Sequence, residues 1–179
     1  MKINTKILAQ ALKAILILII PYLIVIQIIG CFYPTLLFNA NTAEALNKGW
    51  GYDVFNLTLL QQSILFFLGS LSTIPLVCMI ITGVKALNLV KKGEILSEAS
   101  VNLFTKLKLF SLYWAACNIV GYAITSYVFM PKLMQNMNLF LISLVAQVIM
   151  HIGVFLFFAA FTAIIKRGAN LQQDQDLTV

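Results

Sequence analysis

Four long apolar stretches without a single charged residue restrict the fold of this chain more than any other feature. They cover residues 14–33, 63–84, 109–128 and 139–165. About 20 apolar residues of helix cross the roughly 30 Å hydrocarbon core of a bilayer, where only helices and closed barrels satisfy their own backbone. We therefore predict an all-α integral membrane protein, a four-helix bundle with one span in each stretch.

The overall composition supports a membrane fold over a soluble one. Hydrophobic residues make up 61% of the 179 residues and charged residues only 10%, whereas a soluble domain has about 25% charged residues. The spans and their connectors use nearly the whole chain. We predict a single membrane domain over residues 1–179, with the lipid bilayer as its first partner.

The basic residues predict how the chain is oriented. Ten of the twelve lie on one side of the predicted spans: Lys2, Lys6, Lys13, Lys85, Lys91, Lys92, Lys106, Lys108, Lys166 and Arg167. Only Lys48 and Lys132 lie on the other side. Because cytoplasmic loops carry the excess of Lys and Arg, we expect both termini, the connector 85–108 and the tail 166–179 in the cytoplasm.

This charge asymmetry also bears on location and partners. It indicates a multi-pass protein of the bacterial cytoplasmic (inner) membrane. The net charge of +6 is then a topology signal, and without interleaved aromatic residues we expect no direct binding of nucleic acid.

The connectors carry local signals of their own. The second helix should continue to Lys92 and stop at Gly93, and Ser97 should cap a new helix with Glu98 in its first turn. That helix should lead straight into the third span, with a short amphipathic segment on the inner membrane surface. On the outside, the aromatic residues of connector 34–62 predict a loop folded back onto the membrane interface.

Small residues recur in two of the predicted spans. The second span has Gly69, Ser70, Ser72 and Thr73, and the third has Cys117, Gly121 and Thr125 at a spacing of four. Such residues let helix backbones approach closely in lipid. We interpret both sets as helix–helix contact faces in preference to the lining of a pore.

The three cysteines, Cys31, Cys78 and Cys117, form no CxxC pair and no metal-ligand spacing. We expect free, apolar cysteines, no disulfide framework and no metal site. A less favoured alternative is that residues 28–31 (IIGC) form a lipoprotein cleavage site with a lipidated Cys31.

Polar residues inside the predicted spans are the first place to look for function, because they are costly there. The candidates form a midplane polar seam: Gln27, Asn118, Gln147 and His151. Gln147 and His151 also share a helix face with Ser143. The favoured interpretation is hydrogen bonding between helices; the alternatives are a titrating His151 in a proton or substrate path, or a small oligomeric channel or transporter.

Enzyme signatures are absent from the sequence. It has no phosphate-binding glycine loop, no H-E-x-x-H and no G-x-S-x-G, and a single histidine cannot supply both axial ligands of a haem. We therefore expect no catalytic residues, no cofactor and no enzyme activity.

Two segments resemble a family of bacterial four-span membrane proteins called DUF2975, a domain of unknown function. The first is KGEILS at 92–97, followed by VN at 101–102 and LK at 107–108; the second is the ending GANLQQDQDLTV at 168–179. Family members tend to finish on an acidic residue, then Asp-Leu-Thr and Val or Ile. This chain departs from the family pattern at Leu96, where an aromatic residue is more usual, and at Gln173 and Gln175, which make its tail less acidic.

The resemblance implies no biochemical activity, but it does suggest a partner. Genes of this family often neighbour a small helix-turn-helix regulator, which implies a membrane protein that acts with a cytoplasmic transcriptional regulator. We therefore predict a regulatory protein that binds a partner through connector 85–108 and the C-terminal tail. The candidate binding residues are Lys91, Lys92, Gly93, Asp174, Asp176 and Leu177. A homo-oligomer is the partner that the channel alternative implies.

Overall fold

The computed structural model describes residues 5–37, 39–53 and 55–177, and all its regular elements are helices. Four helices are long: α1 (Thr5–Phe32), α3 (Leu59–Lys92), α4 (Glu98–Phe129) and α6 (Met137–Leu177). Three short elements join them at one end: η1 (Pro34–Leu36), α2 (Ala40–Trp50) and α5 (Pro131–Gln135). Each predicted span falls within one long helix, except that Tyr33 lies just after α1.

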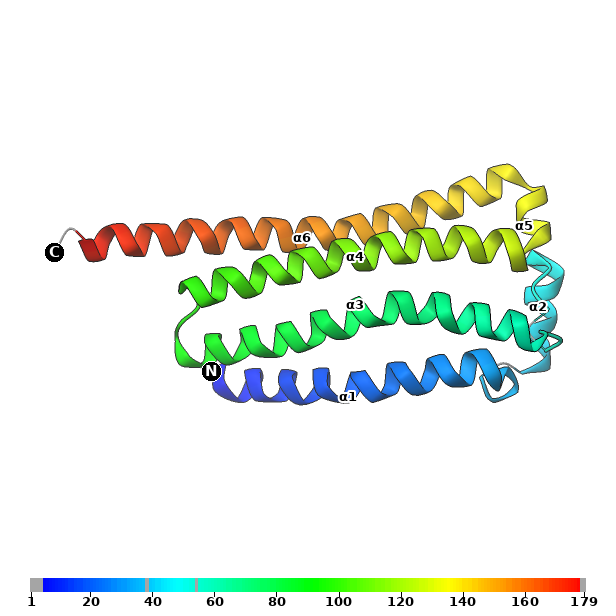
Figure 1. Cartoon of the computed structure of the whole chain (residues 1–179), viewed down its shortest axis with the longest axis horizontal. Coiled ribbons are helices and arrows are strands. Elements are labelled where there is room, and N and C mark those ends of the chain that lie inside the picture. Colours follow the sequence, from blue (N-terminus) through cyan, green and yellow to red (C-terminus); the bar gives the residue numbers. More distant parts are fainter. Residues whose placement is uncertain (1–4, 38, 54, 178–179) are drawn as a thin grey trace.

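The four long helices form a row in which each one packs against the next along the chain. The contacts are α1 with α3, α3 with α4, and α4 with α6, as Figure 1 shows from one edge of the row to the other. Within the described residues, no Cα atom of α1 lies within 8 Å of one in α4 or α6, and none of α3 lies within 8 Å of one in α6. The helices therefore make an open layer with two broad faces.

All four long helices are long and apolar enough to cross a membrane, which confirms the predicted all-α membrane fold. Large apolar side chains such as Leu18, Phe67, Ile142 and Ile164 are more than 60% exposed. In a bilayer these side chains face lipid tails that are as apolar as they are, so no hydrophobic force requires a closed core. This explains how an open row can be stable.

The connector between α3 and α4 folds as its sequence predicts. Gly93 ends α3 with a φ of 82°, a left-handed conformation in which glycine has no Cβ penalty. Ser97 caps α4, accepting a hydrogen bond from Ser100 N at 3.2 Å. The expected segment along the inner membrane surface is wrong, however, because residues 98–108 belong to the single continuous helix α4.

The opposite end of the row is closed by a layer of short elements. Figure 1 shows α2 running across the ends of the long helices, beside α5. Lys132 Nζ donates to Asn47 O at 2.8 Å near the C-terminus of α2, and the Tyr52 ring meets Phe129 edge-on at 6.4 Å. Burial raises the pKa of the Tyr52 phenol above its ordinary value. The described residues of connector 34–62 are thus folded back over the helix ends.

The start of α1 and the end of α6 lie at the same end of the row, as Figure 1 shows. The 41 residues of α6 correspond to about 60 Å of helix, twice the thickness of the hydrocarbon core. The last turns of α6 project past the start of α4. The tail 166–177 is therefore a helical extension of the fourth span.

Candidate functional sites

Gln27 is fully engaged in joining α1 to α3. Its Nε2 donates to Phe66 O at 3.0 Å and to Ser70 Oγ at 2.9 Å, and its Oε1 accepts from Thr73 Oγ1 at 2.7 Å. A Cβ on Gly69 would lie 3.0 Å from Gln27 Nε2, so the glycine makes room for this side chain. The side-chain amide of Gln27 therefore links α1 to α3 through hydrogen bonds.

His151 lies in the interface between α4 and α6 and is 4% exposed. Its ring packs against that of Trp114 with centroids 4.5 Å apart, and its Nδ1 lies 2.7 Å from Gln147 O. Two hydrogen bonds join the same helices on either side of this stack. Tyr122 Oη donates to Ser143 Oγ at 2.6 Å, and Thr162 Oγ1 donates to Phe104 O at 3.1 Å.

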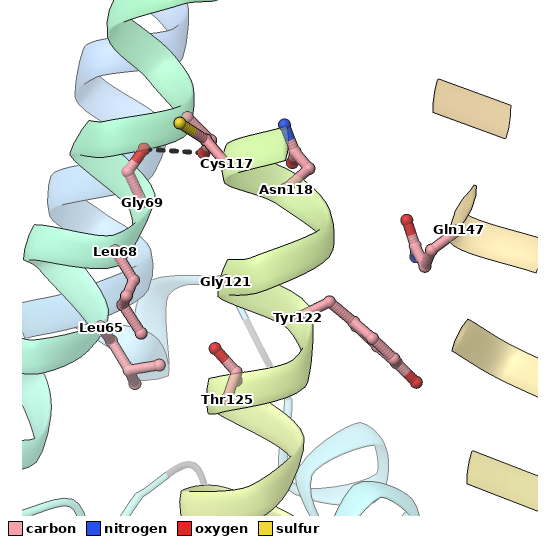
Figure 2. A pocket seen from close by; sticks show the side chains of 10 residues that line it. Leu65, Leu68, Gly69, Cys117, Asn118, Gly121, Tyr122, Thr125 and Gln147 are labelled. Carbon is pink, nitrogen blue, oxygen red and sulfur yellow. Dashed lines mark hydrogen bonds between the residues drawn. The ribbon is translucent and has the colours of Figure 1, made fainter. Parts of the chain in front are cut away.

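Asn118 and Gln147 meet at a cavity of about 280 Å³. Its lining comes from α3, α4 and α6: Leu65, Leu68, Gly69, Ser72, Cys117, Asn118, Gly121, Tyr122, Thr125 and Gln147. Because α4 lies between α3 and α6 in the row, the cavity extends over one face of α4. Figure 2 shows Cys117 and Thr125 pointing toward α3, and Gln147 pointing toward α4.

The predicted polar seam is thus divided among three places. The structure brings Asn118 and Gln147 together, whereas Gln27 belongs to the α1–α3 contact and His151 to the α4–α6 contact. The channel or transporter that would use all four residues stays a prediction.

The small residues have two different roles. Gly69, Ser70 and Thr73 contact Gln27 on α1, as expected of a helix–helix contact face. Ser72 and the stripe on the third span, Cys117, Gly121 and Thr125, line the cavity, where Cys117 and Thr125 point toward α3, and the interpretation of that stripe as a contact face stays a prediction. A Cβ on Gly121 would meet nothing within 4 Å, because neither α3 nor α6 covers this part of α4.

A second hollow, the terminal groove, lies at the end of the row where α1 starts and α6 ends. It has a volume of about 500 Å³ and runs between the start of α4 and the last turns of α6. Its lining residues are Leu96, Glu98, Val101, Asn102, Lys166, Ala169, Asn170, Gln172 and Gln173. A Cβ on Gly168 would lie 2.8 Å from Leu96 Cδ2, so Leu96 packs directly onto the α6 backbone there.

The predicted partner-binding residues lie near this groove but are not among its lining residues. Lys91 and Lys92 are exposed in the last turn of α3, Gly93 caps that helix, and Asp174 is exposed on α6. Asp176 and Leu177 are helical, but their side chains, like residues 178–179, lie outside the described part of the structure.

The residues that do line the groove carry a signal that sequence reasoning missed. On α6, Lys166, Ala169, Asn170 and Gln173 follow the spacing of one helix face, and Glu98, Val101 and Asn102 do so on α4. A polar face on a helix outside the membrane usually means that this face contacts water. The spacing of these residues alone therefore does not distinguish a groove from ordinary exposed surface.

A family model, described as "Protein of unknown function (DUF2975)", matches residues 33–179 of this chain. The chain belongs to this family. No curated protein and no solved structure matches it. The matched region begins directly after α1 and includes both the cavity and the terminal groove.

In this DUF2975 protein, the two segments on which the sequence resemblance rests meet in space. Leu96, Val101 and Asn102 belong to the first, and they form one wall of the terminal groove. Ala169, Asn170, Gln172 and Gln173 belong to the second and form the opposite wall. The family assignment brings no known activity, so the groove and the cavity are the places from which function must be argued.

Proposed function

We propose that this DUF2975 protein is a non-enzymatic regulatory protein of the bacterial cytoplasmic membrane, with both termini inside, that binds a cytoplasmic transcriptional regulator in the terminal groove. The observation that carries the proposal is the meeting of residues 96–102 with residues 166–173 in that groove. These segments are about 70 positions apart in the chain and lie beyond the apolar stretches.

The position of the groove suits a soluble partner. Both of its walls belong to the predicted cytoplasmic side, where ten of the twelve basic residues are found. The last turns of α6 extend past α4, so one wall is accessible along its length. A protein that approaches the membrane from the cytoplasm would meet this end of the row first.

The chemistry of the groove favours a polar partner surface. Four carboxamides line it, from Asn102, Asn170, Gln172 and Gln173, together with one acidic and one basic side chain, Glu98 and Lys166. Carboxamides both donate and accept hydrogen bonds, so they suit a partner segment rich in polar side chains or free backbone groups. We therefore expect binding through hydrogen bonds, with little apolar burial.

The test is capture of partners from native membranes after mild crosslinking, with two matched variants. Ala169→Trp places a large ring in the groove, whereas Leu171→Trp places the same ring on an exposed part of α6 outside it. We expect the wild-type chain and Leu171→Trp to capture a DNA-binding regulator. We expect Ala169→Trp, and a chain truncated after Arg167, to lose it.

Two results would contradict the proposal. Equal capture by Ala169→Trp and Leu171→Trp would show that the groove is not the binding surface. Recovery of the chain itself as a discrete oligomer, with no cytoplasmic protein in any sample, would favour the channel alternative. Membrane insertion of each variant is checked first, because a misinserted chain could lose its partner for an unrelated reason.

A further inference from the structure

The cavity over α4 contains polar groups that lack partners. Among the described residues, no hydrogen bond reaches the side-chain amide of Gln147, the hydroxyl of Thr125 or the Oδ1 of Asn118, whose Nδ2 donates to Trp114 O at 2.7 Å. Gln147 and Asn118 come from different helices, yet both line the same space. A molecule in the cavity would therefore meet these three hydrogen-bonding groups without a competing partner.

These groups lie at a depth where lipid tails cannot satisfy them. Thr125 is four residues from the end of α4 and Cys117 is twelve, so the cavity extends from about 6 to about 18 Å below that helix end. This is the outer half of the hydrocarbon core under the predicted orientation. An unpaired polar group is costly there, and an acyl chain in the cavity would leave all three unpaired.

The lining defines the class of molecule that fits. No Lys, Arg, His, Asp or Glu is among the lining residues, so a charged group would have no counter-charge. The volume of about 280 Å³ is just below the roughly 300–1,000 Å³ of typical small-molecule sites, which limits the occupant to a small polar group. It is also too small to hold a helix of a second copy, because a helix is about 10 Å wide.

The surroundings indicate where the ligand comes from. The cavity opens on a broad face of the row, which faces the bilayer, and Leu65 and Leu68 form an apolar wall beside the polar groups. A molecule with a polar head and an apolar chain would match both parts of this surface. A water-soluble solute would match only the polar part.

We propose that this cavity binds the uncharged head of a bilayer-resident amphiphile, of the hydroxyl- and ester-bearing class to which monoacylglycerols belong. The Gln147 amide donates to an ester carbonyl and accepts from a hydroxyl, and Asn118 Oδ1 accepts from a second hydroxyl. The Thr125 hydroxyl adds a third point of contact nearer the membrane surface. This site is separate from the terminal groove and does not depend on the partner proposed there.

Cys117 provides a native reporter for the cavity. The wild-type chain, in nanodiscs of phosphatidylcholine, is treated with N-ethylmaleimide, and alkylation at each cysteine is followed by mass spectrometry. Cys78 is the internal control, since it is also half-buried but lies at an almost wholly apolar depression beside Ile74 and Val77. A ligand in the cavity should not cover Cys78, so the rate of Cys117 alkylation relative to that of Cys78 reports on the cavity.

Ligand binding is then read as protection of Cys117. Monooleoylglycerol should slow its alkylation roughly tenfold, the effect of two hydrogen bonds of ordinary strength. Octadecene, which has the chain without the head, and glycerol, which has the head without the chain, should each protect far less. Alkylation of Cys78 should not change with any of the three.

Two variants and a matched control assign the protection to the cavity. Gly121→Leu fills the space, and Gln147→Leu removes the amide at similar size, so both should abolish protection by monooleoylglycerol. Gly153→Leu is the control for the first, because a side chain there also meets open space but lies outside the cavity. It should behave as the wild type.

Several results would overturn the proposal. No protection of Cys117 by monooleoylglycerol, or equal protection of Cys117 and Cys78, would mean that the cavity holds lipid tails or water alone. Equal protection by octadecene would show that the cavity does not recognise a polar head. Equal protection by glycerol would show that the ligand is a water-soluble solute and not a bilayer amphiphile. A Cys117–Cys117 disulfide between chains on mild oxidation would assign this face to a second copy.

Discussion

Gln27 joins two helices through three hydrogen bonds, and no other residue of α1 forms as many with α3 in the described part of the chain. We predict that Gln27→Leu lowers the free energy of unfolding by about 1 kcal/mol, because hydrogen bonds between membrane helices are individually modest. Unfolding in SDS, followed by circular dichroism, measures this. Combining Gln27→Leu with Thr73→Val in a double-mutant cycle isolates their shared bond.

The control for Gln27 is Ser63→Ala on α3. Ser63 is exposed, and its hydroxyl donates to Leu59 O of its own helix, so removing it breaks no contact between helices. The free energy of unfolding of the Ser63→Ala variant should match that of the wild type. If Gln27→Leu has the same free energy of unfolding as Ser63→Ala, the hydrogen bonds of Gln27 contribute nothing to the packing of α1 on α3.

His151 supports the α4–α6 interface mainly through ring packing against Trp114. We predict that His151→Phe keeps this packing and changes stability by less than about 1 kcal/mol. His151→Ala leaves an unfilled space and should cost about 2–4 kcal/mol. Trp114 fluorescence during unfolding, in a Trp50→Phe background, measures both. A large loss with Phe would instead show that the His151 nitrogen at Gln147 O is the main contribution.

At the scale of elements, the turn between α3 and α4 depends on one backbone conformation. Gly93 has a φ of 82°, and an L-residue pays about 1–2 kcal/mol to adopt it. We predict that Gly93→Ala loosens this turn and speeds tryptic cleavage after the exposed Lys91 and Lys92. Gly49→Ala in α2 is the control, since Gly49 has no positive φ and open space around its Cα. Equal cleavage of both variants would contradict a strained turn.

The elements were largely predictable because their causes are local. The spans follow from runs of uncharged residues, and the ends of α3 and α4 follow from Gly93 and Ser97, whose geometry depends on nearest neighbours. The amphipathic face after Ser97 was misread, because nothing local distinguishes a helix on the membrane surface from one that continues into the span.

The sites were less predictable because they depend on which helices touch. Asn118 and Gln147 were identified as polar membrane residues, but that they line one cavity follows only from the position of α4 between α3 and α6 in the row. The stripe of Cys117, Gly121 and Thr125 has the spacing of a contact face, and only the arrangement of the row shows that it also borders a cavity. The terminal groove likewise needs two segments that are distant in sequence.

For the whole molecule, the placement of the start of α1 and the end of α6 at one end of the row makes a testable topology. We predict that a cysteine at Glu94 is protected from a membrane-impermeant maleimide in intact cells, whereas one at Asn41 is labelled. Both positions are exposed, so accessibility of the side chain itself is matched. Native Cys31, Cys78 and Cys117 are replaced by alanine beforehand. The reverse labelling pattern would invert the proposed orientation and place the terminal groove outside the cell.

The row of helices also bears on how the chain is built during synthesis. Among the described long helices, each one packs on the long helix made just before it, and a later return is that of α5, whose Lys132 donates to Asn47 O of α2, 85 residues earlier. Contacts between sequence neighbours close short loops and form quickly. Assembly can therefore keep pace with the ribosome, helix by helix, and α6 needs only α4 in place to complete the fold.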